Sequence, residues 1–338
     1  MPSQSGKGTY RVKLGAPHPT CTCPDHQVRR VKCKRIRAVE ISLRREERPD
    51  GTTVVTKTTR VTYKQNWPAY NKAQTLETER FAQLLAGLCR GIVQPKQTKG
   101  RPRLSLSDVV FGPVFKVYST VSGRRATSDL KAWQDKGYML RCPHYNSLLN
   151  YLDDSDLTSI LKALIEESAS PLRAVETDFA VDASGFGTSR FVRWYDHKYG
   201  GESRERVWLK AHLMVGVKTN VVTSVEVTPG TAHDSPYLPQ LVQSTAARFN
   251  VVEVSADKGY LGKDNLAAVA AVGATPYVPF KSNTTGEGPK LWRKLYHYFM
   301  FNRDDFLKHY HKRSNVETAF SMIKGKFGDS LRSKTETA

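Results

Sequence analysis

The order of the apolar segments between residues 174 and 280 limits most strongly what this chain can fold into. Two runs rich in β-branched residues, Leu209–Val217 and Val221–Val227, are separated by a short polar link, which predicts two antiparallel strands. Predicted helices at 238–249 and 263–272 then alternate with predicted strands at 251–256 and 275–280. Paired strands followed by strands that alternate with helices predict an α/β fold with a mixed sheet.

Two of the predicted strands end in an aspartate. Asp182 comes after the apolar residues 179–181, Asp257 comes after the run at 251–256, and a glycine follows each of them closely. Ligands and catalytic groups usually sit at the strand ends of such sheets. An aspartate after a strand is also an ordinary turn residue, so a structural role and a catalytic role stay open for each.

A predicted helix near the C-terminus carries a charged face. At about 100° per residue, this face consists of Tyr310, Arg313, Glu317 and Lys324. A neighbouring apolar stripe would dock the helix on a core and consists of Val316, Phe320, Ile323 and Phe327. The same segment fits a capping box, in which Ser314 is the N-cap and Glu317 binds its amide. Helix capping and a functional site therefore remain alternatives for this stretch.

Asp182, Asp257 and Glu317 form a candidate catalytic set. Three converging carboxylates need a cation to stay ionised together, which predicts Mg²⁺ or Mn²⁺, with two ions expected. Such ions activate a water or a 3′-hydroxyl and stabilise the leaving oxygen of a phosphodiester. Arg313 and Lys324 would then hold the phosphates of the strand that is cut.

The charge of the chain favours a polyanionic partner. It has 52 Lys and Arg against 32 Asp and Glu, a net charge of +20. Nucleic acid is the simplest partner for such a surplus, and a basic surface that only aids solubility is the alternative. No membrane-length apolar run and no signal peptide occur, and five cysteines make no disulfide framework. We therefore expect a cytoplasmic, nucleoid-associated protein with no membrane partner.

Three cysteines, Cys21, Cys23 and Cys33, cluster near the N-terminus. Their spacing is close to that of zinc ligands and resembles the SWIM zinc finger, although Arg35 replaces the final histidine of that motif. His26 or His18 would have to supply the fourth ligand for Zn²⁺. Buried cysteines without a metal are the alternative interpretation.

The pattern predicts three parts in the chain. Residues 1–64 form a basic, cysteine-containing module with a hairpin that turns at Pro49, Asp50 and Gly51, and its first strand includes Ile36, Val39 and Ile41. Residues 65–170 form a helical DNA-binding region, and residues 171–338 form the α/β domain.

Helices within the second part are predicted at 70–90, from Ser107 to a stop at Gly123, at 127–136 and at 143–152. The basic residues among them are Arg124, Arg125, Lys131 and Arg141. These helices predict a helix-turn-helix-like reader of the major groove, and a bundle without such a role is the alternative.

The C-terminal half resembles the DDE transposases of bacterial and archaeal insertion sequences, in the group with a Tyr-x2-Arg-x3-Glu-x6-Lys signature. The intervals of that signature match Tyr310, Arg313, Glu317 and Lys324. The family's Asp-x-Gly-Tyr/Phe motif matches residues 257–260, its first aspartate matches Asp182, and residues 228–235 resemble the loop before its second aspartate. The resemblance covers about residues 170–330.

This resemblance implies an RNase H-like catalytic core with Asp182, Asp257 and Glu317 as the ligands of Mg²⁺ or Mn²⁺. It implies that Tyr310, Arg313 and Lys324 contact DNA. It further implies DNA transposition, in which the protein cuts at terminal inverted repeats and joins the 3′-hydroxyls to target DNA, as a homodimer or larger synaptic complex. His233 and Asp234 stay outside the catalytic set.

The sequence departs from the family in two places. The interval between Asp257 and Glu317 leaves little room for the β-rich insertion of some relatives. The chain also ends soon after Lys324, in a polar segment that caps nothing obvious, so we expect a shortened copy. A metal-dependent nuclease with the same core and an inactive, transposase-derived DNA-binding protein are the alternatives.

Overall fold

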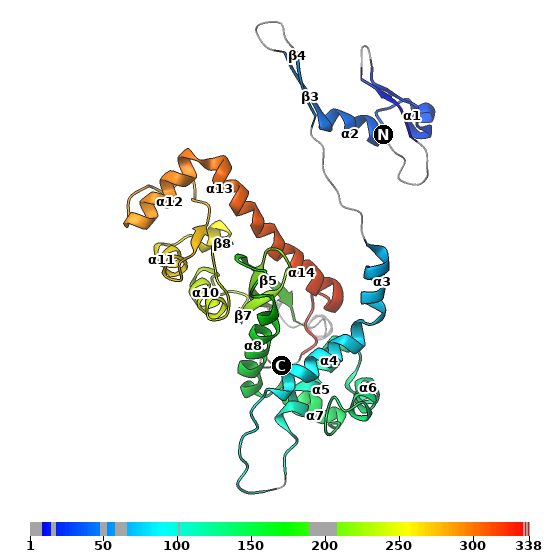
Figure 1. Cartoon of the computed structure of the whole chain (residues 1–338), viewed down its shortest axis with the longest axis vertical. Coiled ribbons are helices and arrows are strands. Elements are labelled where there is room, and N and C mark those ends of the chain that lie inside the picture. Colours follow the sequence, from blue (N-terminus) through cyan, green and yellow to red (C-terminus); the bar gives the residue numbers. More distant parts are fainter. Residues whose placement is uncertain are drawn as a thin grey trace, which may run out of the picture. The chain divides into compact units, whose positions relative to one another are not determined.

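The computed structural model describes residues 9–14, 18–47, 53–57, 66–100, 102–188, 208–333, 335 and 337. The chain divides into two compact units, Met1–Thr75 and Leu76–Ala338, whose elements are labelled in Figure 1. Among the described residues, no helix has the length and apolar character needed to cross a membrane.

The first unit is built around the cysteines. β1 (Val12–Lys13) pairs antiparallel with β2 (Thr20–Cys21), and α1 (Pro24–Arg29) and α2 (Lys34–Ser42) follow. Cys21, Cys23, Cys33 and Ile36 are buried together as its small core. β3 (Leu43–Glu47) pairs antiparallel with β4 (Thr53–Lys57), as the predicted hairpin requires, and α3 (Trp67–Thr75) ends the unit. The hairpin's turn lies outside the described residues.

The strand predicted to contain Ile36, Val39 and Ile41 is wrong, because all three residues lie in α2. Ile36 shares the buried cluster with Cys33, three residues before it. That interval brings two side chains to one face of a helix, so the cysteine core favours helix over strand here.

The second unit begins with a helical part. Its helices are α4 (Glu77–Arg90), α5 (Leu106–Ser119), α6 (Gly123–Asp135), α7 (Tyr145–Leu152) and α8 (Ser155–Ala169), and a 3-10 turn, η1 (Ser170–Leu172), follows. They bury a common apolar cluster that includes Leu85, Phe111, Leu130 and Leu148. α8 joins this part to the sheet, because Lys162 forms a 2.6 Å ion pair with Glu226 on β7.

Several predicted helix boundaries are wrong. The helix predicted over 70–90 is two helices, α3 and α4, which meet near Leu76. The N-cap of α5 is Ser105 instead of Ser107, and its hydroxyl accepts a hydrogen bond from the Asp108 amide at 3.1 Å. The buried Asp108 carboxylate also accepts bonds from the amides of residues 140 and 141, which fixes this start. Gly123 does not stop a helix: it is the first residue of α6, after the N-cap Ser122.

A five-stranded mixed sheet forms the centre of the second unit. Its order is β7 (Val222–Pro229), β6 (Trp208–Gly216), β5 (Asp178–Gly187), β8 (Glu253–Ala256) and β9 (Thr275–Tyr277). The pairs β7–β6 and β6–β5 are antiparallel, whereas β5–β8 and β8–β9 are parallel. The prediction of an α/β fold with an RNase H-like mixed sheet, preceded by a cysteine-containing module and a helical region, is confirmed.

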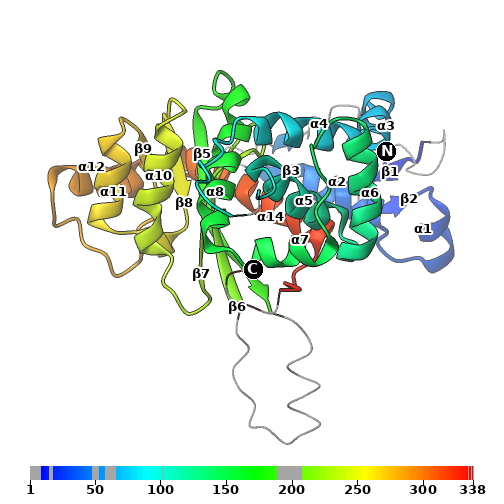
Figure 2. The same ribbon diagram turned by 90° about the horizontal axis from the view of Figure 1, so that it is seen from below.

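Helices cover both faces of this sheet (Figure 2). On one face, α10 (Leu238–Ala246), η3 (Lys258–Tyr260) and α11 (Lys263–Ala271) bury Leu241, Tyr260 and Leu266 against Phe179 and Met214. On the other face, α14 (Ser314–Phe327) buries Val316 and Phe320 against Ala180, Leu213 and Val215. The apolar stripe predicted for this helix is therefore confirmed, except that Phe327 is exposed. In the sequence, α12 (Lys290–Phe301) and α13 (Arg303–Tyr310) lie between β9 and α14.

β5 continues beyond the point at which a turn is expected. Asp182 does not end the strand, because β5 stays paired with β6 from Phe179 as far as Gly187. Gly185 lies under the ring of Trp208, and a Cβ there would come within 2.7 Å of the ring. The glycine that resembles a turn residue in the sequence therefore serves the packing of two strands.

Residues 329–332, which follow α14, are bound to both parts of the second unit. The Gly187 amide at the end of β5 donates to the Asp329 carbonyl at 2.9 Å, and the Leu331 amide donates to the Gly187 carbonyl at 2.7 Å. Arg332 donates to the Thr120 carbonyl after α5 at 3.0 Å. Backbone pairing and one side-chain contact thus hold this polar segment in place.

Candidate active site

The two aspartates lie side by side where β8 ends. The last pair of the parallel ladder between β5 and β8 is Val181 with Ala256, and Asp182 and Asp257 are the next residues of the two strands. Side chains alternate along a strand, so Asp182 points to the same face as Ala180, which α14 covers. Asp257 is the N-cap residue of η3. The sheet register therefore brings the two carboxylates side by side at the C-terminal end of β8.

Glu317 lies on α14, but the helix predicted from Tyr310 onward is interrupted. α13 ends at Tyr310, a 3-10 turn, η4 (His311–Arg313), follows, and α14 begins at Ser314. The predicted capping box is wrong: the N-cap of α14 is Arg313, and the Ser314 hydroxyl donates to the His311 carbonyl at 3.0 Å. Glu317 is thus not used as a cap, and its side chain is 55% exposed.

Arg313 connects two of the three carboxylates. Its Nη1 lies 2.7 Å from Oδ2 of Asp182, and its Nη2 lies 2.6 Å from Oε1 of Glu317. Burial acts to lower the pKa of Arg313, but the charges of Asp182 and Glu317 outweigh it and the pKa is raised. The guanidinium therefore stays charged and neutralises part of the acidic site.

The pKa of Asp182 is nevertheless raised. Burial is the largest cause, and the negative charges of Asp257 and Glu317 add to it. The amide of Ala183, which donates to Oδ1 at 2.9 Å, and Arg313 oppose the shift without cancelling it. The ionised form of Asp182 is thus short of positive charge even with Arg313 in contact.

Lys324 and Tyr310, the other members of the signature, lie beside this site. Nζ of Lys324 donates to the Ser184 hydroxyl on β5 at 2.8 Å and lies 5.0 Å from the centre of the Phe186 ring. Tyr310 is half-buried and packs against the large core cluster that includes Phe306, with the guanidinium carbon of Arg313 6.0 Å from its ring centre. Only Lys324 therefore continues the line of polar groups along β5.

The donor set fits a divalent cation. Three carboxylates supply the hard oxygen ligands that Mg²⁺ and Mn²⁺ prefer, and the raised pKa of Asp182 marks a negative charge that such an ion would relieve. Arg313 lies between Asp182 and Glu317, and these carboxylates are not gathered around one point: within the described ranges, only the three cysteines bring three ligand atoms within 4.8 Å of one another. Ligation by both Asp182 and Glu317 therefore requires Arg313 to change partners.

The cysteines of the first unit form the second candidate metal site. Cys21, Cys23 and Cys33 are buried, with their sulfur atoms within 4.8 Å of one another. Burial acts to raise the pKa of Cys23, but hydrogen bonding from the His26 amide, the other two cysteines and Arg35 outweighs it and lowers the pKa to about 7. A thiol with this pKa is readily deprotonated for a metal. Nδ1 of His26, proposed as a fourth ligand, lies 2.8 Å from the Val31 carbonyl oxygen.

Sequence reasoning missed a polar row on β6, which lies on the α10 face of the sheet, opposite the face of Asp182. Lys210 forms a 2.9 Å ion pair with Asp234, and the fully buried His212 places Nε2 2.9 Å from the Thr228 hydroxyl. The first contact ties the loop after β7 to the sheet and the second joins β6 to β7, while His233 is exposed. The alternation of Trp208, Lys210 and His212 was a detectable signal, because polar side chains at every second position share one face of a strand.

Residues 173–338 match the family described as the transposase DDE domain. The matched residues contain the whole sheet, the two aspartates and the helix with Glu317, and the match supports a transposase function that acts on DNA with a divalent metal. No solved structure matches the chain.

Proposed function

We propose that this protein is a DNA transposase that cleaves DNA at transposon ends and joins the 3′-hydroxyl to target DNA with the help of divalent cations. The observations that support the proposal are that Asp182 and Asp257 are neighbours in the register of the sheet and that Arg313 joins Asp182 to Glu317. Bound there, Mg²⁺ or Mn²⁺ would supply charge neutralisation and an activated oxygen nucleophile.

In this proposal the protein's own residues hold the reactants. Asp182, Asp257 and Glu317 are the metal ligands, and burial of Asp182 keeps water from screening its charge. Arg313 and Lys324 are the phosphate contacts, because both cations face β5 beside the carboxylates. A DNA phosphate would compete with Asp182 and Glu317 for Arg313, and so free these carboxylates as DNA binds. Tyr310 supports the Arg313 end of this contact.

A basic groove in the helical part supports DNA as the partner. It has a volume of about 1540 Å³ and lies between the segment 94–106 and helices α6 and α7. Its lining includes Lys99, Arg103, Lys131 and Arg141, and Asp154 is the acidic residue among the described lining residues. Tyr145 also lines it, with the Arg124 guanidinium 5.0 Å from the ring. Clustered cations beside aromatic rings suit a nucleic-acid backbone, so we assign DNA binding to this region.

We also propose that Cys21, Cys23 and Cys33 bind Zn²⁺. The three buried sulfur atoms supply three of the four positions of a tetrahedral site. A core as small as that of the first unit gains much of its stability from a metal. Buried cysteines without metal remain the alternative, which metal analysis decides.

The test of the main proposal is a strand-transfer assay. A labelled, pre-cleaved transposon end is incubated with target DNA and Mg²⁺, and an uncleaved end is incubated in parallel. We expect Glu317→Gln to lower both rates about a thousandfold, roughly 4 kcal/mol of transition-state stabilisation, while DNA binding is retained. Glu287→Gln, the same change at an exposed carboxylate, should leave both rates unchanged.

The outcome separates the alternatives. Cleavage of the uncleaved end without joining of the pre-cleaved end would identify a metal-dependent nuclease. DNA binding with equal, background rates in the wild type and Glu317→Gln would identify an inactive DNA-binding protein. Either result would overturn the proposed transposition.

A further inference from the structure

A second pair of carboxylates lies on the same two strands, at the residues where β5 and β8 begin. Asp178 and Glu253 are the first residues of β5 and β8 and are direct partners in the parallel ladder. Both are four residues before the aspartates of the candidate site, so all four acids point to one face, with about 13 Å between the two pairs. Two like charges directly opposite each other destabilise a sheet unless a cation joins them.

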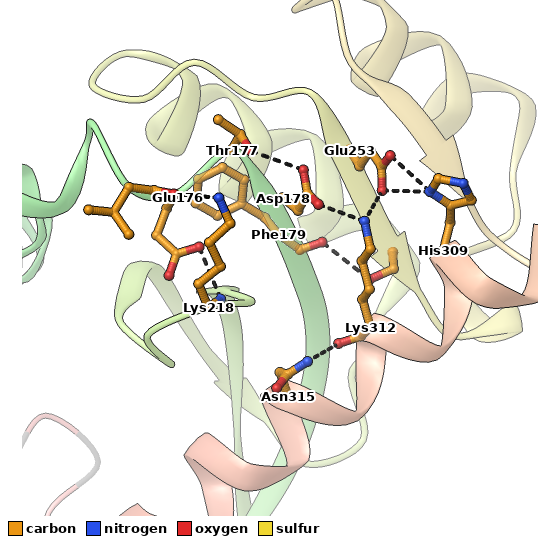
Figure 3. A network of polar contacts seen from close by, with 11 residues as sticks. Glu176, Thr177, Asp178, Phe179, Lys218, Glu253, His309, Lys312 and Asn315 are labelled. Atoms are coloured by element: carbon orange, nitrogen blue, oxygen red, sulfur yellow. Dashed lines mark hydrogen bonds and ion pairs between the residues drawn. The ribbon is translucent and has the colours of Figure 1, made fainter. Parts of the chain in front are cut away.

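Lys312 supplies that cation. Its Nζ lies 2.6 Å from Oδ2 of Asp178 and 2.6 Å from Oε2 of Glu253, while Nδ1 of His309 lies 2.9 Å from Glu253. Figure 3 shows the lysine reaching from the helical segment to a point between the two acids, with His309 on the far side of Glu253. Burial acts to lower the pKa of Lys312, but bonds to Asp178 and Glu253 outweigh it and the pKa is raised.

Consecutive residues of η4 therefore hold two separate points of one strand. Lys312 binds Asp178 at the beginning of β5, and Arg313 binds Asp182 four residues later. A 3-10 turn rotates by about 120° per residue, so neighbouring side chains diverge. The interruption between α13 and α14 thus allows two adjacent cations to reach two separate acids. The Lys312 carbonyl also accepts a bond from the Asn315 side-chain amide at 2.8 Å, which ties η4 to the first turn of α14.

The two carboxylate pairs differ in how they are neutralised. Lys312 contacts both members of the first pair, whereas Arg313 contacts Asp182 and, in the described part of the chain, no cationic side chain forms an ion pair with Asp257. A side chain of the protein itself therefore bridges and partly neutralises the first pair. The second pair is left with negative charge for a ligand to neutralise.

We propose that Lys312 is a positioning residue for the candidate active site: it fixes η4 on the sheet and so sets where Arg313 and Glu317 stand relative to Asp182 and Asp257. This role rests on the proposed function for its consequence in metal binding, but the fixing of η4 is a property of the fold alone. Outer contacts of this kind orient metal ligands, and their loss typically weakens metal binding about 10- to 100-fold.

The test compares Lys312→Met with Lys312→Arg in the full-length chain. Amide hydrogen exchange measures the local stability of η4 and the first turn of α14, and electron paramagnetic resonance measures free Mn²⁺ in a titration. We expect Lys312→Met to speed exchange at residues 311–318 at least about tenfold and to weaken Mn²⁺ binding about tenfold or more. Lys312→Arg, which keeps a cation between the acids, should restore both.

Lys308→Met is the matched control, because Lys308 is exposed on α13 and its partner is the exposed Asp305 at 3.5 Å. It should leave both readings unchanged. Asp178→Asn removes one of the two acids and should change both readings in the same direction but less, so it keeps the test open if Lys312→Met does not fold.

Unchanged exchange at residues 311–318 in folded Lys312→Met or in Asp178→Asn would overturn the positioning role. Faster exchange with unchanged Mn²⁺ affinity would also overturn it, because Lys312 would then stabilise η4 without affecting the site. A wild type that binds no Mn²⁺, together with faster exchange in both Lys312→Met and Asp178→Asn, would count against the proposed metal site and support the fixing of η4.

Discussion

Asp182 is the residue at which the chemistry of the candidate site and the stability of the fold conflict. Its pKa is raised above the ordinary value of 3.8, chiefly by burial and also by Asp257 and Glu317. The folded state therefore binds the Asp182 proton more tightly than the unfolded chain. Stability consequently falls as the pH rises from 3.8 through the raised pKa. An ionised Asp182 is needed to bind a cation, so the fold carries a cost for its site.

We expect Asp182→Asn to remove this pH dependence. The free energy of unfolding of the variant should increase relative to the wild type as the pH rises, by about 1.4 kcal/mol for each unit by which the pKa is raised. Urea denaturation between about pH 4 and pH 7 measures this difference. Mg²⁺ should stabilise the wild type at neutral pH and not the variant. Parallel pH curves for the two proteins, with Asp304→Asn as an exposed control, would contradict the expectation.

At the scale of the elements, strands and helices follow local patterns, whereas their ends depend on distant partners. The strands β6 and β7 and the helices α10 and α11 lie close to their predicted positions, because their apolar periodicity is strong. β5 runs past Asp182 because it pairs with β6 as far as Gly187, and the local pattern of residues 182–187 does not predict this continuation. The 3-10 turn at 311–313 could not be predicted from its own sequence, because the acids that stabilise it lie on β5 and β8.

The candidate site could be predicted only in part. The three carboxylates were predictable because each belongs to a motif that resembles those of a family, and the described register places the two aspartates side by side. Lys312, Asp178 and Glu253 were not, because each is an ordinary charged residue in its own segment and only the fold brings them together. Arg313 was predicted as a phosphate contact, but its ion pairs with two of the carboxylates depend on tertiary structure.

The cysteine element gives a prediction of its own. The wild type should contain about one Zn²⁺ per chain by elemental analysis after removal of free metal, because three buried thiolates hold the ion tightly. Cys33→Ser should lose the zinc and expose the first unit to proteolysis. Cys142→Ser changes a cysteine outside the cluster and should retain it. A zinc-free wild type with reduced cysteines would favour the interpretation without metal.

At the scale of the whole molecule, the surplus of positive charge predicts how DNA binding depends on salt. Each phosphate contact adds about 0.9 to the slope of log affinity against log salt concentration. The double variant Lys131→Gln, Arg141→Gln removes two cations from the groove and should reduce this slope by up to about 2 for duplex DNA. Fluorescence anisotropy at several salt concentrations measures it.

The control removes the same charge elsewhere in the helical part. Arg90→Gln with Lys136→Gln lies outside the groove lining, so this double variant should change the slope less than the groove variant does. Equal slopes for the two double variants would show that the net charge of +20, instead of the groove, governs DNA binding.

The lysine between Asp178 and Glu253 also has a consequence for how such a sequence can drift. Replacing Lys312 alone leaves two acids facing each other, and replacing one acid alone leaves the lysine with a single partner. Substitutions at these three positions should therefore be accepted together or in compensating order, although they lie in segments more than fifty residues apart. Among related chains, the loss of the lysine should coincide with the loss of at least one acid. Covariation of these three positions would then reveal an ion pair that no motif in the linear sequence shows.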